Sequence, residues 1–295
     1  MSGITIDRSR RAGPIAAAPS GSIWQYVSPT RLSCWLSCPL KFRFRYVEGL
    51  HVPPTPSLLL GQQVHRGLEY WYRRRMDRAD VAMEETVAET IADWDRRVFD
   101  GEVQLDSPAE EARLRGQAGD LVRAYLEQVP ADEPRPLAVE SRMSAPLVDP
   151  ASGEDLGLPL LGIADLVLPG EEGPVVVDFK TAARAAPPLE ITHEIQLSAY
   201  AWLYRQLTGE RETALEIRSL IKTKTPKVDV HRYPARTDTH FHRLFAVVRE
   251  YVAALDGDRL NYRPGFTCGM CEFRTGPCAA WDGRYSPWGG DSLGP

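Results

Sequence analysis

The stretch Gly162–Pro187, GIADLVLPGEEGPVVVDFKTAARAAP, holds two apolar, β-rich runs on either side of the turn PGEEGP. Such runs, separated by Gly, Pro and acidic residues, predict a β-hairpin. Asp165 and Asp178 lie thirteen positions apart across this turn, and Lys180 follows Asp178 by two residues. Side chains alternate along a strand, so Asp178 and Lys180 share one face, and Asp165 on the partner strand can lie about 5 Å from Asp178. The hairpin therefore predicts two carboxylates and a lysine gathered at one strand end.

Two neighbouring carboxylates repel each other, and a hard divalent cation relieves the repulsion. Mg²⁺ or Mn²⁺ accepts one or two carboxylates together with water and phosphate oxygens, whereas zinc prefers nitrogen or sulfur ligands. A lysine beside such a site can orient a metal-bound water for attack on phosphorus. The alternative is that the aspartates are solvated residues near a turn and that Lys180 lies on an edge strand. The run VVVDFKT favours the metal site, because a strand that is apolar on both faces is buried and its charges need partners.

The rest of the chain predicts helices in front of a βββαβ core, which is an α+β (mixed α/β) fold. Ser28 is a plausible N-cap followed by Pro29 at the first helical position, and the helix restarts near Pro39. Apolar periodicity then predicts helices over 57–76, 81–100 and 107–129, strands over 137–148, 158–168 and 174–182, a helix over 189–209, strands over 213–224 and 227–234, and a last helix over 236–257.

The composition is that of an ordinary globular protein, with 295 residues, 43% of them hydrophobic and 25% charged. The net charge of −5 gives no global attraction to nucleic acid, so a polyanion would have to bind at a local basic patch. No apolar run is long enough to cross a bilayer, and the N-terminal stretch lacks a continuous apolar signal core. We expect a soluble cytoplasmic protein with a loose N-terminal tail and no membrane partner.

Three of the five cysteines, Cys268, Cys271 and Cys278, lie within eleven residues, which is typical of a metal or cluster site rather than of secreted disulfides. A fourth ligand has to come from elsewhere in the chain. Cys38, directly before Pro39, is one candidate, and Cys34 one helical turn earlier is either a packed thiol or a substitute ligand. Four thiolates bind zinc or an iron-sulfur cluster, and ligand chemistry alone does not separate the two.

Taken in order between about Ser28 and Trp281, the motifs SCPLKFRFRY, GQQVHRGLE, GIAD, VVDFKT and QLSAY and the C-terminal cysteines resemble the PD-(D/E)XK nuclease superfamily. Within it they resemble the RecB-like exonucleases, including CRISPR-associated and helicase-nuclease members. The resemblance implies a restriction-endonuclease-like core sheet with flanking helices. It divides the chain into a tail at 1–21, one nuclease domain at 22–281 and a tail at 282–295, the domain holding a helical insertion at 57–130, a catalytic core at 135–256 and a cluster clamp formed by Cys38 with 268–278.

The resemblance also assigns roles to single residues. The metal ligands would be His65, Asp165, Asp178 and the backbone carbonyl of Phe179; Lys180 would be the catalytic lysine, Gln196 and Tyr200 the Q-x-x-x-Y helix residues, and Glu140 a looser match to an accessory acidic residue. Cys38, Cys268, Cys271 and Cys278 would bind a 4Fe-4S cluster, with zinc as the alternative. Without the resemblance, His65 is an ordinary helix histidine, and Gln196 and Tyr200 share a helix face that binds phosphate, positions Lys180 or packs on the sheet.

Five basic residues are candidates for a groove that follows a DNA backbone, with solvated helix and strand faces as the alternative: Lys222, Lys224, Lys227, Arg43 and Arg45. The chain has no phosphate-binding loop of the Walker type, so any helicase would be a separate protein. We expect an Mg²⁺- or Mn²⁺-dependent exonuclease acting on single-stranded DNA or single-stranded ends, with 5′ to 3′ polarity, in recombination, repair or phage or CRISPR DNA processing. The alternatives are an endonuclease that trims DNA with an integrase partner and an inactive DNA-end-binding subunit. Oligomerisation is open.

Overall fold

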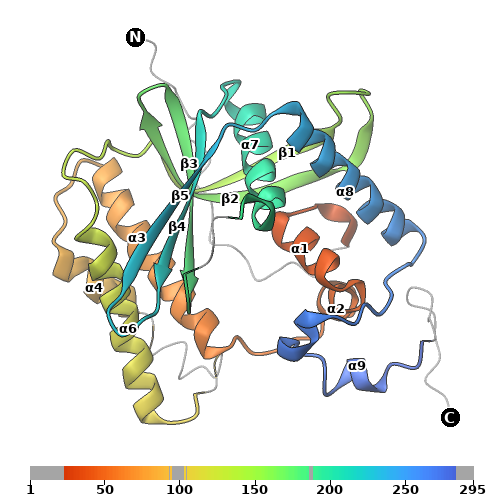
Figure 1. Ribbon diagram of the computed structural model, residues 1–295, viewed down its shortest axis with the longest axis horizontal. Coiled ribbons are helices and arrows are strands. Elements are labelled where there is room, and N and C mark those ends of the chain that lie inside the picture. Colours follow the sequence, from red (N-terminus) through yellow and green to blue (C-terminus); the bar gives the residue numbers. More distant parts are fainter. Residues whose placement is uncertain (1–22, 93, 95–102, 104, 186–188, 284–295) are drawn as a thin grey trace.

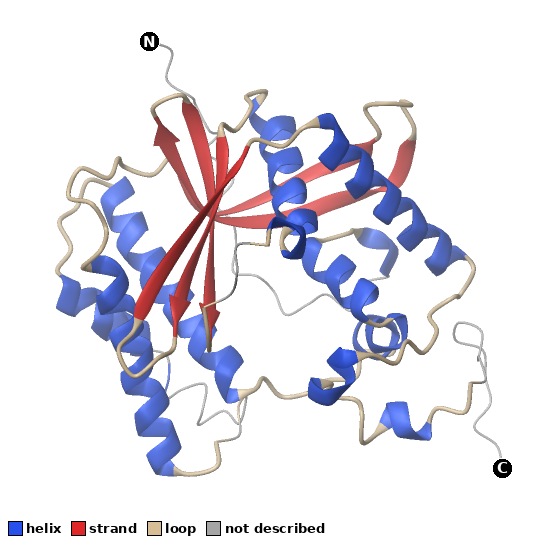
Figure 2. Ribbon diagram, in the orientation of Figure 1, coloured by secondary structure: helices blue, strands red, loops and turns tan. Residues whose placement is uncertain are grey.

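The computed structural model describes residues 23–92, 94, 103, 105–185 and 189–283. Its centre is a five-stranded mixed sheet with helices on both faces (Figures 1 and 2). The strand order is β1-β2-β3-β4-β5, in which β3 and β4 are parallel and the other neighbours are antiparallel. The strands are β1 Ala138–Val148, β2 Asp155–Gly170, β3 Gly173–Ala182, β4 Ala214–Ile221 and β5 Lys227–Pro234.

The predicted α+β architecture and the predicted hairpin are confirmed. β2 and β3 pair in the register Leu166 with Val177, up to a tight turn at Gly170 and Gly173. The parallel pairing of β3 with β4 requires a crossover, and helix α7 (Glu194–Thr208) supplies it. The strand predicted over 227–234 is confirmed as β5, which follows the βββαβ core and pairs antiparallel with β4 at the sheet edge.

One face of the sheet is covered by a helical layer that follows the N-terminal segment in the sequence: α3 (Pro56–Met76), α4 (Met83–Ile91) and α6 (Pro108–Leu126). A glycine sets the close contact between two of these helices, because a β-carbon at Gly67 would lie only 2.1 Å from Thr90 Oγ1. Within the helix that we predicted over 81–100, residues 93 and 95–100 lie outside the described part of the chain. This layer contributes the helix that carries His65.

The opposite face is covered by α7 together with α1 (Pro29–Ser37) and α8 (Asp238–Asp256). The Ser28 hydroxyl accepts a hydrogen bond from the Arg31 amide at 3.2 Å, which confirms the predicted N-cap of α1. Shorter elements complete the fold: α2 (Pro39–Phe42), α9 (Pro277–Ala280), the π-helical turn η2 (Arg43–Val47) and the 3-10 turns η1 (Ile23–Gln25), η3 (Glu190–Thr192) and η4 (Phe266–Met270).

The described residues contain no helix that is both long and apolar enough to cross a membrane. The tail predicted at 1–21 lies outside the described residues, as does the tail predicted at 282–295 except for its first two residues.

Candidate active site

Along β1 and β2, the regular alternation of side chains between the two faces of the sheet is interrupted at one pair of residues, Glu140 and Asp165. Leu160 and Ala164 of β2 belong to the core on the α7 side, whereas Leu166, also an even-numbered position, belongs to the core on the α3 side. The ladder keeps one register on both sides of this point, but no pairing joins Glu140 to Asp165. Glu140 has a φ of 44°, a left-handed conformation that costs a non-glycine residue energy. This switch of faces displaces both carboxylates from the regular alternation of the sheet.

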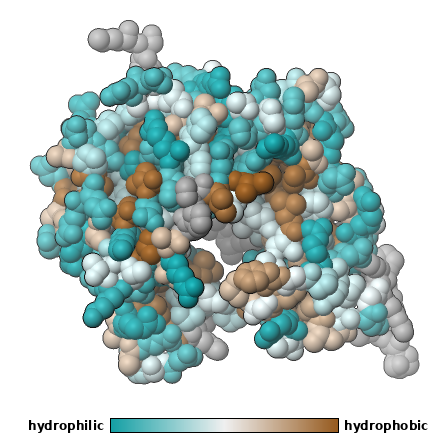
Figure 3. Space-filling view, in the orientation of Figure 1, coloured by the Kyte–Doolittle hydropathy of each residue, from teal (hydrophilic) through white to brown (hydrophobic). Residues whose placement is uncertain are grey.

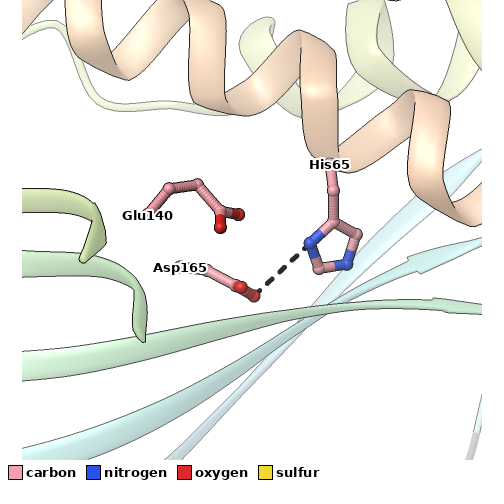
Figure 4. Close-up of side chains that lie close together, drawn as sticks. All are labelled: His65, Glu140 and Asp165. Carbon is pink, nitrogen blue, oxygen red and sulfur yellow. Dashed lines mark ion pairs between the residues drawn. The ribbon is translucent and has the colours of Figure 1, made fainter. Parts of the chain in front are cut away.

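The two carboxylates meet His65 of α3, and Figure 4 shows the three side chains converging from α3, β1 and β2. One ligand atom from each of His65, Glu140 and Asp165 lies within 4.8 Å of the others, and the His65 Nδ1 atom is 3.6 Å from Asp165 Oδ2. The approach of α3 depends on a small residue one turn earlier, because a β-carbon at Gly61 would lie 2.9 Å from Thr181 Oγ1. One nitrogen and two oxygen donors at this spacing can hold a divalent cation.

Asp178 and Lys180 form the adjoining half of the site. Asp178 is only 2% exposed, and the Lys180 Nζ atom lies 2.7 Å from its Oδ2 atom without hydrogen-bond alignment. Its Oδ1 atom accepts a hydrogen bond from Gln196 Nε2 at 2.8 Å, and the Tyr200 hydroxyl lies 3.5 Å away. Gln196 also donates to the Tyr200 hydroxyl at 2.9 Å. The two helix residues therefore contact the Asp178 carboxylate of the candidate site and do more than pack on the sheet.

Phe179 connects the two halves through its backbone, since its N–H donates to Asp165 Oδ2 at 2.7 Å. Its ring points to the other face and is fixed between Tyr72 and Tyr125, with centroid distances of 6.0 and 5.4 Å. These tyrosine hydroxyls lie 2.6 Å apart, and Arg218 donates to Tyr125 at 2.7 Å. A buried aromatic and polar cluster thus holds the strand segment between Asp178 and Lys180 in place.

Burial and charge shift the protonation of these groups. Burial, followed by the charge of Asp165, raises the pKa of Glu140 to about 7. Burial also raises the pKa of Asp178 to about 6, although the Lys180 ammonium opposes the shift. Burial lowers the pKa of His65, but hydrogen bonding and the charge of Asp165 outweigh it and the net pKa is raised. Each shift reflects negative charge crowded into a partly buried site, which a bound cation would neutralise.

These groups lie in an open cleft of about 1170 Å³ that is lined by α3 on one side and by β1, β2 and the segment around Tyr26 on the other. Figure 3 shows the molecular surface hollowed near its centre, between α3 and the α1–α2 side of the molecule. The cleft lining includes His65, Glu140, Asp165 and Lys180 together with Arg142. A charged polymer therefore has direct access to the metal-ligand group.

The four cysteines assigned by resemblance line a second, smaller cavity of about 230 Å³, between α2 and the C-terminal segment. Cys38, Cys271 and Cys278 pack around the buried residues Leu40, Phe44 and Phe273. Burial, followed by the charges of the other three thiols, raises the pKa of Cys278. The segment at residues 36–41 is joined here to the segment at residues 263–272 by a Lys41–Glu272 ion pair at 2.8 Å and by a hydrogen bond from Arg263 to the Leu36 carbonyl at 2.5 Å.

Cys34 does not line this cavity. It is buried in the core on the α7 side, and burial raises its pKa to about 11. Of the two alternatives for Cys34, the structure supports the packed thiol.

The five basic residues predicted to follow DNA are not gathered into one groove. Lys222 and Lys224 follow the last residue of β4 and lie in the β4–β5 turn, so the prediction that they alternate on a strand is wrong. Pro226 lies in this turn, where a missing N–H prevents continuous pairing. Lys222 donates to Ser57 at 2.6 Å, and the exposed Lys227 opens β5.

Arg43 and Arg45 lie on η2, in a separate part of the molecule from the β4–β5 turn (Figure 1). Arg43 pairs with Glu48 at 2.8 Å, and Arg45 pairs with Glu272. None of these residues lines the active-site cleft in the described part of the chain. Residues that the sequence did not single out, including Tyr26 and Arg142, line the cleft instead.

The cleft gathers carboxylates, a histidine and a lysine, and three of these residues could hold a divalent cation together, an arrangement suited to metal-assisted hydrolysis of a phosphodiester. The model of the PD-(D/E)XK nuclease superfamily matches residues 26–276, and the chain belongs to this superfamily. The predicted superfamily is therefore confirmed, whereas the RecB-like and CRISPR-associated subgroup stays a prediction.

A solved structure agrees with this fold. A crystal structure of a candidate exonuclease from Eubacterium rectale superposes with a TM-score of 0.56 at 15% identity, covering 89% of this chain and 93% of that chain. The crystal structure of SSO0001 gives a TM-score of only 0.37 at 12% identity, covering 74% of this chain and 96% of that chain. No curated protein matches the sequence.

Proposed function

We propose that this protein is an Mg²⁺- or Mn²⁺-dependent deoxyribonuclease that degrades single-stranded DNA or single-stranded ends. The observation that carries the proposal is the convergence of His65, Glu140 and Asp165 with the Asp178–Lys180 pair in one solvent-accessible cleft. Carboxylates with raised pKa values beside a charge partner in a cleft are typical of functional sites, and Glu140 and Asp178 both meet this description.

The donor set fits a hard divalent cation. It offers carboxylate oxygens and one imidazole nitrogen, and Asp178 adds a buried carboxylate whose Oδ2 atom lies 2.7 Å from the Lys180 ammonium. Burial and the charge of Asp165 raise the pKa values of Glu140 and Asp178, in the case of Asp178 against the opposing Lys180 ammonium, and a bound cation would lower both. A metal ion bound here would polarise the scissile phosphodiester and lower the pKa of a water molecule.

The protein's own groups have separable roles. The Lys180 ammonium lies at the cleft surface, where it would orient the attacking water and balance charge on the phosphate. Asp178 holds this ammonium at 2.7 Å, and Gln196 holds Asp178 from the other side at 2.8 Å. The Phe179 N–H fixes Asp165, and we propose that the carbonyl of Phe179 is a further metal ligand. The arrangement is preorganised, since these groups already contact each other before substrate binds.

We also propose that Cys38, Cys268, Cys271 and Cys278 bind a 4Fe-4S cluster that clamps the two ends of the domain. All four line one cavity, which supports a shared group. A zinc site would bring four sulfurs within about 4 Å of one another, given Zn–S bonds of about 2.3 Å. Zinc is the alternative occupant, and iron and zinc analysis of anaerobically purified protein separates the two.

The RecB-like resemblance supports exonuclease action with 5′ to 3′ polarity. Single-stranded DNA labelled at either end, together with a closed circular single strand, tests the activity, polarity and mode of cleavage in one assay. We expect metal-dependent degradation of the linear strands and survival of the circle. Cleavage of the circle would instead indicate the endonuclease alternative.

Two substitutions test the site itself. We expect Lys180→Ala and Asp178→Ala each to abolish cleavage, while Asp229→Ala on β5, outside the cleft, leaves it unchanged. Circular dichroism and thermal unfolding check that each variant is folded. Full activity in a folded Lys180→Ala variant would refute the assignment, and DNA binding without cleavage in the wild-type protein would support the inactive end-binding alternative.

A further inference from the structure

The cleft continues beyond the metal-ligand group along β2, where the sheet extends past α3 (Figure 1). Leu161, Ile163 and Asp165 are half-buried and line the cleft, whereas Gly162 and Ala164 between them are buried. A β-carbon at Gly162 would lie 2.8 Å from a side-chain carbon of Leu203 in α7, so this alternation is fixed by packing on the far face. At about 3.3 Å per residue, the two apolar side chains lie about 7 and 13 Å along the strand from Asp165.

Arg142 lies beside Leu161 and Ile163, the two apolar side chains of this part of the cleft. It pairs in register with Ile163, is exposed and lines the cleft. It makes no ion pair with any residue in the described part of the chain, whereas Arg66 and Arg73, on the α3 side, pair with Glu89 and Glu69. Arg142 therefore presents a cation without an ion-pair partner among the described residues, beside the path that leads to the proposed metal ligands.

Tyr26 lies where this path ends. Val27 is hydrogen-bonded alongside β2, from Val27 N to Pro159 O at 2.9 Å and from Leu161 N to Val27 O at 2.8 Å. Tyr26 is half-buried and lines the cleft, and the Arg31 guanidinium lies 3.7 Å from its ring centroid. Arg31 is itself buried and donates to the carbonyls of Tyr26 at 2.8 Å and Ile23 at 3.3 Å. One ring face is thus backed by a fixed cation, which makes the aromatic ring a rigid surface at the cleft.

We propose that Leu161, Ile163, Arg142 and Tyr26 form a binding track for the unpaired nucleotides next to the cleaved phosphodiester. Arg142 would contact a phosphate, and Tyr26 would stack on a base a few nucleotides from the metal ligands. A paired base inside a duplex has both faces covered by its neighbours, so stacking on Tyr26 selects a single strand or a frayed end. The proposal rests on the proposed nuclease function and identifies the residues that choose its substrate.

Binding of fluorescent single-stranded DNA in the presence of a chelator tests the track without cleavage. We expect Tyr26→Leu to weaken binding roughly tenfold and Tyr26→Phe to retain it, because stacking needs the ring and not the hydroxyl. We expect Arg142→Gln to weaken binding and to reduce the slope of log affinity against log salt by about 0.7, the contribution of one phosphate contact on a single strand. Arg135→Gln, an exposed arginine outside the cleft, is the matched control and leaves both quantities unchanged.

An abasic residue moved along the oligonucleotide identifies the stacked base. In the wild-type protein, removal of one particular base weakens binding, and in Tyr26→Leu the same removal has no further effect. Equal binding by the wild-type protein and folded Tyr26→Leu and Arg142→Gln variants would overturn the track, even if the protein cleaves DNA. Weaker binding by these variants in a protein that never cleaves DNA would uphold the track and reject the nuclease function.

Discussion

Replacing Glu140 by Gln should stabilise the metal-free protein. Burial and the neighbouring charge of Asp165 raise the pKa of Glu140 from 4.5 to about 7. At 1.36 kcal/mol for each pKa unit, this difference corresponds to about 3 kcal/mol of destabilisation when the carboxylate is fully ionised. The folded state binds more protons than the unfolded state between these two pH values, so the free energy of unfolding falls as the pH rises through the interval.

The substitution removes the charge and keeps the shape, and it also leaves the left-handed backbone at this residue in place. Urea unfolding of both proteins in a chelator, between pH 4 and pH 8, measures the effect. We expect equal stabilities near pH 4 and an advantage of up to about 3 kcal/mol for Glu140→Gln at pH 8. The raised pKa of Asp178 adds its own pH dependence to both proteins, and the difference between them isolates Glu140.

Added Mg²⁺ should reverse this order. The wild-type protein has the complete ligand group and should gain more stability from the metal than Glu140→Gln, which lacks one anionic ligand. A variant that is less stable than the wild-type protein at pH 8 without metal would refute the reasoning. So would a stability difference that does not change with pH, because it would come from packing rather than from charge.

Three further outcomes are expected. Gln196→Ala removes the 2.8 Å hydrogen bond that Gln196 donates to the ionised Asp178 carboxylate, so the pKa of Asp178 should rise further. The acidic limb of the pH–rate profile should then move to higher pH. Cys268→Ser should remove visible absorbance and iron from anaerobically purified protein and lower its melting temperature, whereas Cys34→Ala, a packed thiol outside the cavity, should retain both absorbance and iron. Tyr125→Phe removes a hydroxyl that contacts two buried partners at 2.6 and 2.7 Å, and urea unfolding should show a loss of about 1–3 kcal/mol.

The hairpin that carries Asp165 and Asp178 could be predicted from the sequence because the pattern that specifies it is local. Its apolar runs, its turn and the spacing of its charges determine the register, and the ladder of Leu166 with Val177 leaves Asp165 and Asp178 at the next opposed positions. The crossover helix was readable for the same reason, since Gly209 ends it with a φ of 72° at the expected place.

The position of His65 beside Asp165 could not be predicted from the local sequence pattern. Its helix could be predicted, but its distance from Asp165 depends on how closely α3 approaches the sheet, and Gly61 gives only a weak hint of that contact. The resemblance to a known family supplied what local reasoning lacked. In the same way, local pattern left Cys34 open as a substitute ligand, and the structure separates it from Cys38, because Cys34 is buried in the core and Cys38 lines the cysteine cavity.

Glu140 received only an accessory role because nothing in its neighbourhood signals an unusual backbone. The run AVESRM contains no glycine, yet Glu140 adopts a φ of 44° in the middle of β1. Its signal lay in the register of two strands, since positions 140 and 165 fall opposite each other once the β1–β2 ladder is known. A single sequence does not give that register directly.

The switch at Glu140 and Asp165 works against stability in two ways. A non-glycine residue in the left-handed region costs about 1–3 kcal/mol, and burial together with the charge of Asp165 raises the pKa values of Glu140 and Asp178. A regular β1–β2 ladder through this pair would avoid the backbone cost, but it would return the side chains at these positions to the alternation of the rest of the strands. Because the switch gathers both carboxylates at His65, a cation bound there would offset this loss, and the proposed metal binding would be coupled to folding stability through these three residues.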